Sequence, residues 1–168
     1  GNGVINMGTL QQSAGDLILN TNGNGAATVV NNAAIDFGTS NVGGALNVTA
    51  SAGTITQNGG ALTVAGTSAF TTSTNDQAIT LSNATNALTG AVAFTTGGTT
   101  GNVVIDNGTT ALDLAASTIN GTLTATGGAS AGIVDSGNVA VAGNVTLTTD
   151  AGNGVINMGT LQQSAGDL

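Results

Sequence analysis

The sequence predicts an all-β protein, a parallel β-solenoid in which coils of about 18–20 residues follow one another as a continuous tandem repeat. Three observations lead to this prediction. Residues 1–17 return without change as residues 152–168. Apolar residues alternate with polar ones in short clusters, and the chain is built almost entirely from small side chains. Repetition of a sequence unit along a chain is the signature of solenoid architectures, in which each unit packs only on its neighbours.

The two identical segments indicate that the chain is a window from a longer tandem array. Residues 1–151 would form one repeat unit, and residues 152–168 would begin the next identical unit. A weaker repeat lies inside the first unit, because residues 45–72 align with residues 122–149. We therefore expect two diverged halves of about 75 residues, each with about four coils, and about eight coils in the unit.

Three isoleucines follow the same internal repeat. Ile5, Ile79 and Ile156 recur at nearly equal intervals along the chain. This spacing again divides the unit into two halves of similar length.

The apolar clusters read as strands of three to five residues. Examples are Ala45–Val48, Ala61–Val64 and Ala91–Phe94, each with period-two alternation and each bounded by Gly, Asn, Thr or Asp. Such alternation between turn formers predicts strands, with Val, Ile, Leu and Ala facing inward and Thr, Asn and Asp facing outward. The absence of proline fits this arrangement, because every coil must donate its N–H groups to a neighbour.

Composition excludes several classes of protein. The chain has no Lys, Arg, His, Cys, Trp or Tyr and a net charge of −8. Without cations it is not expected to bind nucleic acid or anionic membrane surfaces. No apolar run reaches the ~18 residues of a membrane-spanning helix, so no membrane insertion is expected. The side chains are too small for a thick core but can line a narrow interior.

Three stretches resemble repeats of the giant filamentous-haemagglutinin-like exoproteins. These stretches are GGALNVTASAGTITQNGGALTVAGTSAFTT at 43–72, ITLSNATNALTGAVAFTT at 79–96 and LDLAASTINGTLTATGG at 112–128. The resemblance implies right-handed parallel β-helices that bacteria secrete by two-partner or autotransporter routes. It also implies projection from the cell surface and a role in adhesion, aggregation or biofilm structure. The complete loss of Lys and Arg departs from familiar members and favours a purely structural shaft.

Aspartate is the only ionisable side chain available for catalysis. Asp106 with Asp113, or Asp36 in place of Asp113, would be the candidates for an acid and a base in glycoside hydrolysis. No cation or aromatic platform accompanies them, and we expect solvated carboxylates rather than an enzyme. The sequence therefore predicts no catalytic residues and no cofactor.

Calcium is the sharper hypothesis for a bound ligand, because Asp, Asn and turn carbonyls supply the oxygen atoms that this ion prefers. Asp76, Asp106 and Asp150 lie in turn-like segments and are the weak candidates for a structural calcium site. The tandem glycine- and aspartate-rich calcium repeat is missing, and loose screening by divalent ions is the competing interpretation.

Asparagine offers a further stabilising device. Asn31, Asn32, Asn107 and Asn120 follow predicted strands and are candidates for amide ladders between successive coils. Ordinary turn preference explains the same positions equally well.

Together these observations predict a structural shaft segment of an extracellular or cell-surface bacterial filament or adhesin. Its partner would be itself, through coil-on-coil stacking along the filament axis and through lateral bundling. Two alternatives remain open: a discrete soluble β-solenoid that binds ice or a glycan, and a small subunit of a non-covalent self-assembling fibre. An isolated piece would expose unpaired strand at both ends and associate end to end.

Overall fold

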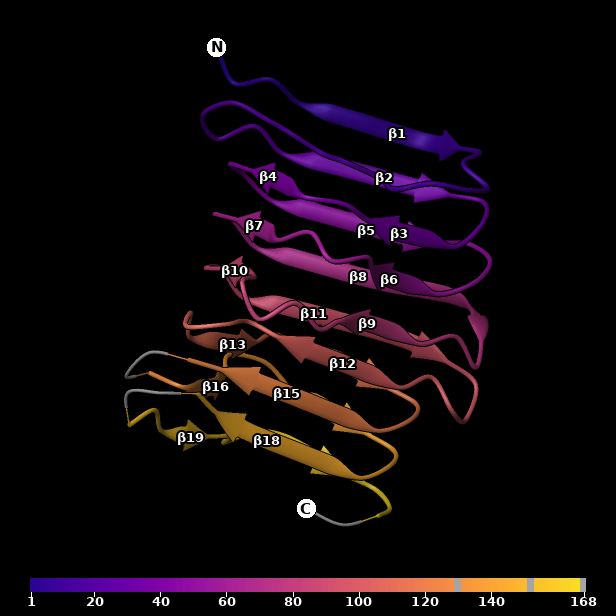
Figure 1. The fold of residues 1–168 in the computed structure, drawn as a ribbon. Helices are drawn as coiled ribbons and strands as arrows, with labels where there is room; N and C mark the ends of the chain where they lie inside the picture. The colour runs from indigo at the N-terminus through magenta and orange to yellow at the C-terminus, as the bar shows by residue number, and fades with distance from the viewer. Residues whose placement is uncertain (129–130, 151–152, 167–168) are drawn as a thin grey trace.

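The computed structural model is a stack of short strands wound about one axis, with the two termini at opposite ends of the stack (Figure 1). It describes residues 1–128, 131–150 and 153–166. All strand pairs among these residues are parallel. The predicted parallel β-solenoid is therefore confirmed. Within the same ranges there is no helix that could cross a membrane.

Each coil has three sides, and the strands of successive coils build three faces. Face 1 consists of β1 (Ile5–Leu10), β2 (Ala27–Asn31), β5 (Leu46–Ala50), β8 (Ser68–Asn75), β11 (Val92–Gly97), β14 (Ser117–Ile119), β17 (Val139–Val141) and β20 (Leu161–Gln163). Face 2 is a six-stranded sheet of β3 (Ile35–Phe37), β6 (Ile55–Gln57), β9 (Ile79–Leu81), β12 (Val103–Asp106), β15 (Leu123–Gly127) and β18 (Val145–Thr149).

Face 3 runs down the remaining side of the stack. It consists of β4 (Ser40–Val42), β7 (Leu62–Val64), β10 (Ala87–Leu88), β13 (Leu112–Leu114), β16 (Ile133–Asp135) and β19 (Ile156–Asn157). These six strands follow one another along one side of the molecule (Figure 1). The upper three form a separate sheet, whereas β13 also pairs with β11 through Val92 and Leu114, so that its sheet joins face 1.

The coils are longer than the sequence predicted. The interval between paired residues ranges from 19, between Ala27 and Leu46, to 24, between Ser68 and Val92. The chain makes about seven turns of about 22 residues, so the expectation of shorter coils, about eight in the unit, was wrong. The additional length belongs to strands such as β4, β10 and β14. Their sequences, SNV, AL and STI, are too short or too polar at the start to give a period-two apolar signal.

The core is one thin column of aliphatic side chains along the axis. Strands alternate between buried and accessible residues, as in β5, where Leu46, Val48 and Ala50 are buried. The three phenylalanines pack in its interior: the ring centroids of Phe37 and Phe70 lie 6.3 Å apart edge to face, and those of Phe70 and Phe94 lie 5.8 Å apart and stacked. The predicted inward placement of the apolar residues is confirmed.

The sequence predicts a boundary between two repeat units near the C-terminal end of the stack. The boundary between residues 151 and 152 lies outside the described residues. The division into residues 1–151 and 152–168 stays a prediction.

Candidate functional site

The surface that recurs throughout the molecule is the contact between one coil and the next. On face 2, Ile35, Ile55, Ile79, Val103 and Leu123 stack in register and are almost completely buried. Their amides donate to the following coil, for example from Ile35 to the Thr54 carbonyl at 2.9 Å. Each coil therefore covers the polar edge of its neighbour, which only closed or stacked sheets achieve. This repeated interface is the candidate functional element.

Buried asparagines secure the corners between faces. Asn31 and Asn107 are both fully buried. Asn107 accepts a hydrogen bond from the Leu88 amide at 2.8 Å and donates to the Leu88 carbonyl at 3.0 Å. Asn31 forms the same pair of bonds with the backbone of Gln12. These amides replace strand pairing with the preceding coil at a corner. They bond to main chain, so the expected stacking of Asn31 and Asn107 on other asparagines is not what they do.

The other two predicted ladder residues differ from each other. The Asn120 side chain bonds across coils, donating to the Thr96 carbonyl at 2.9 Å. Its partner is again main chain of the preceding coil. Asn32 is exposed beside Asn31.

A third buried asparagine, Asn86, connects three coils and was not singled out from the sequence. Its Oδ1 accepts from the Leu62 amide at 2.8 Å, and its Nδ2 donates to the Asp106 carbonyl at 3.0 Å. Gln57 adds a donor and an acceptor to the same amide. Asn86 follows a turn and no apolar cluster marks it, so only knowledge of the coil length could have identified this residue.

Three serines in the described part of the chain are buried in the interior, and the hydroxyls of two of them form hydrogen bonds. The Ser40 hydroxyl donates to the Gly38 carbonyl and accepts from the Leu19 amide, both at 3.0 Å. The Ser117 hydroxyl donates to the Ala115 carbonyl and accepts from the Phe94 amide. The buried Ser68 hydroxyl has no hydrogen-bond partner. A buried polar group without a partner costs free energy.

The Asp76 carboxylate binds turn amides of the next coil. Its Oδ1 accepts from the amides of Thr99 and Thr100 at 2.7 and 2.9 Å and from the Thr100 hydroxyl. Hydrogen bonds from the backbone of Thr99 and of Thr100 lower the pKa of Asp76 below its ordinary value of 3.8. The residue has a positive φ of 62°, a conformation that Asp and Asn tolerate better than most side chains.

Asp135 makes the equivalent connection near the other end of the stack. Its Oδ1 accepts from the Gly159 amide at 2.8 Å, and its Oδ2 accepts from the amide and hydroxyl of Thr160 at 2.6 Å. Partial burial raises the pKa of Asp135, but the hydrogen bonds from Thr160 and Gly159 together outweigh it and lower the pKa below 3.8. The ionised carboxylate thus holds the bend between β19 and β20.

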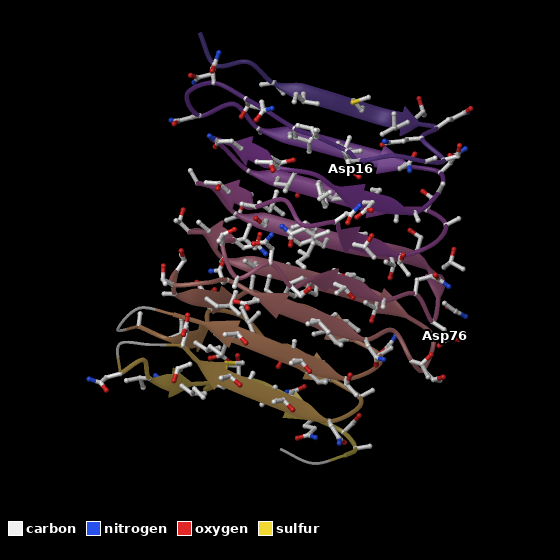
Figure 2. The ribbon with its side chains drawn as sticks, in the orientation of Figure 1. Asp16 and Asp76 are labelled. Atoms are coloured by element: carbon white, nitrogen blue, oxygen red, sulfur yellow. The ribbon has the colours of Figure 1, made fainter. Side chains whose placement is uncertain are left out.

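The structure does not bring the three calcium candidates together. Asp76 precedes β9, whereas Asp106 ends β12 and Asp150 follows β18, at the opposite end of the face 2 strands. Figure 2 shows Asp76 at a corner on one side of the stack, far along the axis from Asp16. Among the described residues no group of three or more His, Cys, Asp or Glu side chains could hold a metal ion. The three residues offer no shared site, and structural calcium stays an untested hypothesis beside the prediction of no metal.

The carboxylates considered for catalysis are also spread over the fold. Asp36 lies on β3 of face 2, where its Oδ1 accepts from the Thr56 hydroxyl at 3.0 Å. Asp106 ends β12, and its Oδ1 accepts from the Gly108 amide at 2.9 Å. Asp113 lies on β13 of face 3, and its Oδ1 is buried without a hydrogen-bond partner. Asp36 and Asp106 are separated along face 2 by β6 and β9, so the structure does not bring this pair of carboxylates together.

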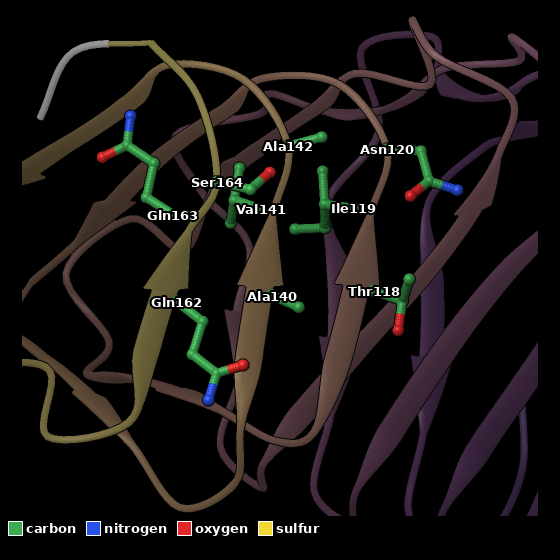
Figure 3. A pocket seen from close by; sticks show the side chains of 9 residues that line it. All are labelled: Thr118, Ile119, Asn120, Ala140, Val141, Ala142, Gln162, Gln163 and Ser164. Carbon is green, nitrogen blue, oxygen red and sulfur yellow. The ribbon is translucent and has the colours of Figure 1, made fainter.

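A shallow groove of about 200 Å³ runs across the C-terminal ends of β14, β17 and β20 and the residues that follow them (Figure 3). Residues 118–120, 140–142 and 162–164 line it, one set from each of three successive coils. The lining residues, all in the described part of the chain, carry no charge. The groove is thus an uncharged feature of the coil edge.

The two ends of the stack differ from its sides. The exposed large hydrophobic side chains of the described residues all lie near an end: Val4, Met7, Ile18, Val155 and Ile156. At the C-terminal end an apolar hollow of about 310 Å³ opens between β18, β19 and β20. Its lining consists of Val145, Leu147, Ile156, Met158 and Leu161. The core of the solenoid is therefore open at this end.

Comparison with known proteins places these coils in a repeat family. A family described as repeats of unknown function (DUF5649) matches the chain twice, over residues 24–95 and 100–167. The chain belongs to this family. The first DUF5649 match ends within β11 and the second begins just before β12, so that together they cover most of the coils. No match was found among curated proteins or among solved structures.

Proposed function

We propose that this DUF5649 repeat protein is a structural shaft segment of an extracellular or cell-surface bacterial filament or adhesin, and that it acts without catalysis. The observation that carries the proposal is the confinement of exposed large hydrophobic side chains, among the described residues, to the two ends of the stack. Contiguous apolar surface on a soluble protein marks an interaction site. Apolar surface at the ends, together with side strands whose main-chain groups are hydrogen-bonded to neighbouring coils, favours growth along the axis.

The internal interface supports the same proposal. Register and strand pairing repeat from coil to coil, so a further coil on Val145, Leu147 and Leu161 would continue contacts already made many times in the chain. A thin aliphatic core and main-chain hydrogen bonds along the axis make a rod whose length can increase without a new kind of contact.

The proposed cell-surface setting rests on different grounds. It is supported by the resemblance to filamentous-haemagglutinin-like exoproteins and by the sparse negative charge, which disfavours non-specific self-association of the sides. Immunogold labelling of intact producing cells tests the setting. Labelled surface fibres are expected, and label confined to the cell interior would contradict it.

End-on association tests the shaft itself. Sedimentation velocity and electron microscopy of the 168-residue chain are expected to show rods of one width and several lengths. Ile156→Asp places a charge on the open end and should abolish the longer rods. Thr146→Asp, on the exposed side of β18, is the matched control and should leave them.

A chain that remains a monomer at high concentration would contradict the proposal. It would instead favour the discrete binding module, whose ends must be closed. Equal loss of rods in both variants would also contradict it, because association would then depend on net charge rather than on the open end.

A further inference from the structure

The two DUF5649 matches are separated by an interval that is not a whole number of coils. They begin at residues 24 and 100, an offset of 76. From Ala27, three coil steps lead along face 1 through Leu46 and Ser68 to Val92. Val103, which has the same offset from Ala27, lies beyond Val92 on face 2. One repeat therefore spans three coils and one additional face.

The face that carries the longer strands also differs between the two repeats, by the same step of one face. In the first repeat β5 and β8, with five and eight residues, lie on face 1, and the face 2 strands β3 and β6 have three residues. In the second repeat the five-residue strands β15 and β18 lie on face 2, and the face 3 strands β13 and β16 have three. The long side of the coil has moved by one face.

The buried polar groups move with the strands. Asn31 ends β2 on face 1, and its counterpart Asn107 directly follows β12 on face 2. Each pairs with the main chain 19 residues earlier. Ser40 begins β4 on face 3, and Ser117 begins β14 on face 1. Their hydroxyls make the same pair of bonds, so the local structure is kept while the face changes.

Close contacts between glycines repeat in the same way. A Cβ on Gly66 would lie 2.6 Å from the Gly44 carbonyl carbon, at the corner before β8 on face 1. A Cβ on Gly143, its counterpart in the second repeat, would lie 3.0 Å from the Gly121 carbonyl oxygen, at the corner before β18 on face 2. The tight corner therefore also advances by one face.

We infer that equivalent residues of successive DUF5649 repeats lie on successive faces of the solenoid, rotated by one face about the axis. Three successive repeats therefore present the same surface on all three faces. Ile5, Ile79 and Ile156 follow this rule, since they lie on face 1, face 2 and face 3. Three repeats would complete ten coils, because the three additional faces make one more coil. At a coil rise of ~4.8 Å, equivalent patches lie about 16 Å apart along the axis.

The consequence concerns how partners meet the shaft. A partner that recognises a patch of one repeat finds the next copy on a neighbouring face rather than in line with it. A second shaft of the same sequence can likewise make one kind of side contact in three directions. The inference depends on the fold alone and holds whether or not the shaft function does.

Distances between spin labels test the rotation, and the absence of cysteine allows labels to be placed at will. Asp36 and Thr124 lie in one outward column of face 2, four coils apart through Thr56, Thr80 and Val104. Their backbones should be about 19 Å apart. Asn47 and Thr124 are sequence equivalents but lie on face 1 and face 2.

In double electron–electron resonance of the two double-cysteine variants, the Asp36/Thr124 pair should give the shorter and narrower distance. The Asn47/Thr124 pair should give a longer one, because its labels point from different faces. Thr49/Thr118, three coils apart in one column of face 1, is the control for stacking, at about 14 Å.

An Asn47/Thr124 distance equal to or shorter than the Asp36/Thr124 distance would overturn the inference. Should either variant fail to give the β-rich circular dichroism of the parent, a second set replaces it: Thr56/Thr146 on face 2 against the sequence equivalents Ala69/Thr146. The same order of distances is expected from that set, and the reverse order would overturn the inference.

Discussion

The same sequence begins and ends this chain, and its two copies fold differently. In the first copy Ile5 and Leu10 belong to one strand, β1, which pairs along β2 through Ala27 and Asn31. In the second copy the equivalent Ile156 pairs with Ile133 of β16 on face 3, whereas Leu161 pairs with Val139 of β17 on face 1. One copy is a side of a coil, and the other is a corner.

The neighbouring coil explains the difference. The second copy rests on Asp135, whose carboxylate binds Gly159 and Thr160 and so holds the bend between β19 and β20. Among the described strands, β1 of the first copy pairs with β2 alone. Interior segments behave otherwise: Leu46–Ala50 and Leu123–Gly127 are sequence equivalents, lie between two coils each, and both form five-residue strands. Neighbours on both sides fix a coil's shape, and a single neighbour selects one of several.

The largest expected difference is in the free energy of unfolding, between alanine substitutions at an interior glycine and at a terminal one. A Cβ on Gly66 would lie 2.6–2.7 Å from three backbone atoms of Gly44 and Ala45. Gly66→Ala should therefore reduce the free energy of unfolding by about 3 kcal/mol. Gly8→Ala is the matched control, since nothing lies within 4 Å of a Cβ there. Urea unfolding of both variants measures the difference, and equal losses would refute close stacking at Gly66.

The buried asparagines give the next contrast. Asn107→Ala leaves the buried Leu88 amide without its acceptor and should cost about 2 kcal/mol. Asn31→Ala should cost about 1 kcal/mol, because its partner Gln12 belongs to the partly accessible terminal coil. Chemical denaturation compares the two variants. A larger loss for Asn31→Ala would mean that the terminal coil is packed as firmly as an interior one.

The interior serines should respond with opposite signs. Ser68→Ala removes an unpaired buried hydroxyl and should raise the free energy of unfolding by about 1 kcal/mol. Ser117→Ala leaves the Phe94 amide unpaired and should lower it by about 1 kcal/mol. Thermal unfolding distinguishes them. Destabilisation by Ser68→Ala would show that its hydroxyl is bonded.

The smallest effect is a pH dependence of the second copy. The pKa of Asp135 is lower in the folded protein than its ordinary value, so the ionised group contributes stability above the pKa of the unfolded chain. That contribution is lost as pH falls through the lower, folded pKa. Acidification should therefore loosen the bend at Gly159, seen as broadened amide signals of Gly159 and Thr160. Asp135→Asn should show weakened signals at neutral pH already, whereas Asp16→Asn is the control.

Much of the fold could be predicted from the sequence, because alternation and repetition act locally. The inward placement of Leu46, Val48 and Phe70 follows from period-two patterning alone. The coil length could not be predicted, since β10 and β14 carry too few apolar residues to signal a third side. The polar contacts depend on which residues meet across coils. Once the coil length is known, partners such as Asn107 and Leu88 follow.

Residue-resolved amide hydrogen exchange distinguishes coils that have neighbours on both sides from coils that have one neighbour. We expect the slowest exchange in the interior strands from β5 to β15 and faster exchange at both ends. We also expect different patterns in the two copies. The Ser164 amide donates to the Val141 carbonyl and should exchange more slowly than the amide of its equivalent, Ser13. The Ile5 amide donates to the Ala26 carbonyl and should exchange more slowly than that of its equivalent, Ile156. One identical pattern in both copies, or uniform protection along the chain, would contradict these expectations.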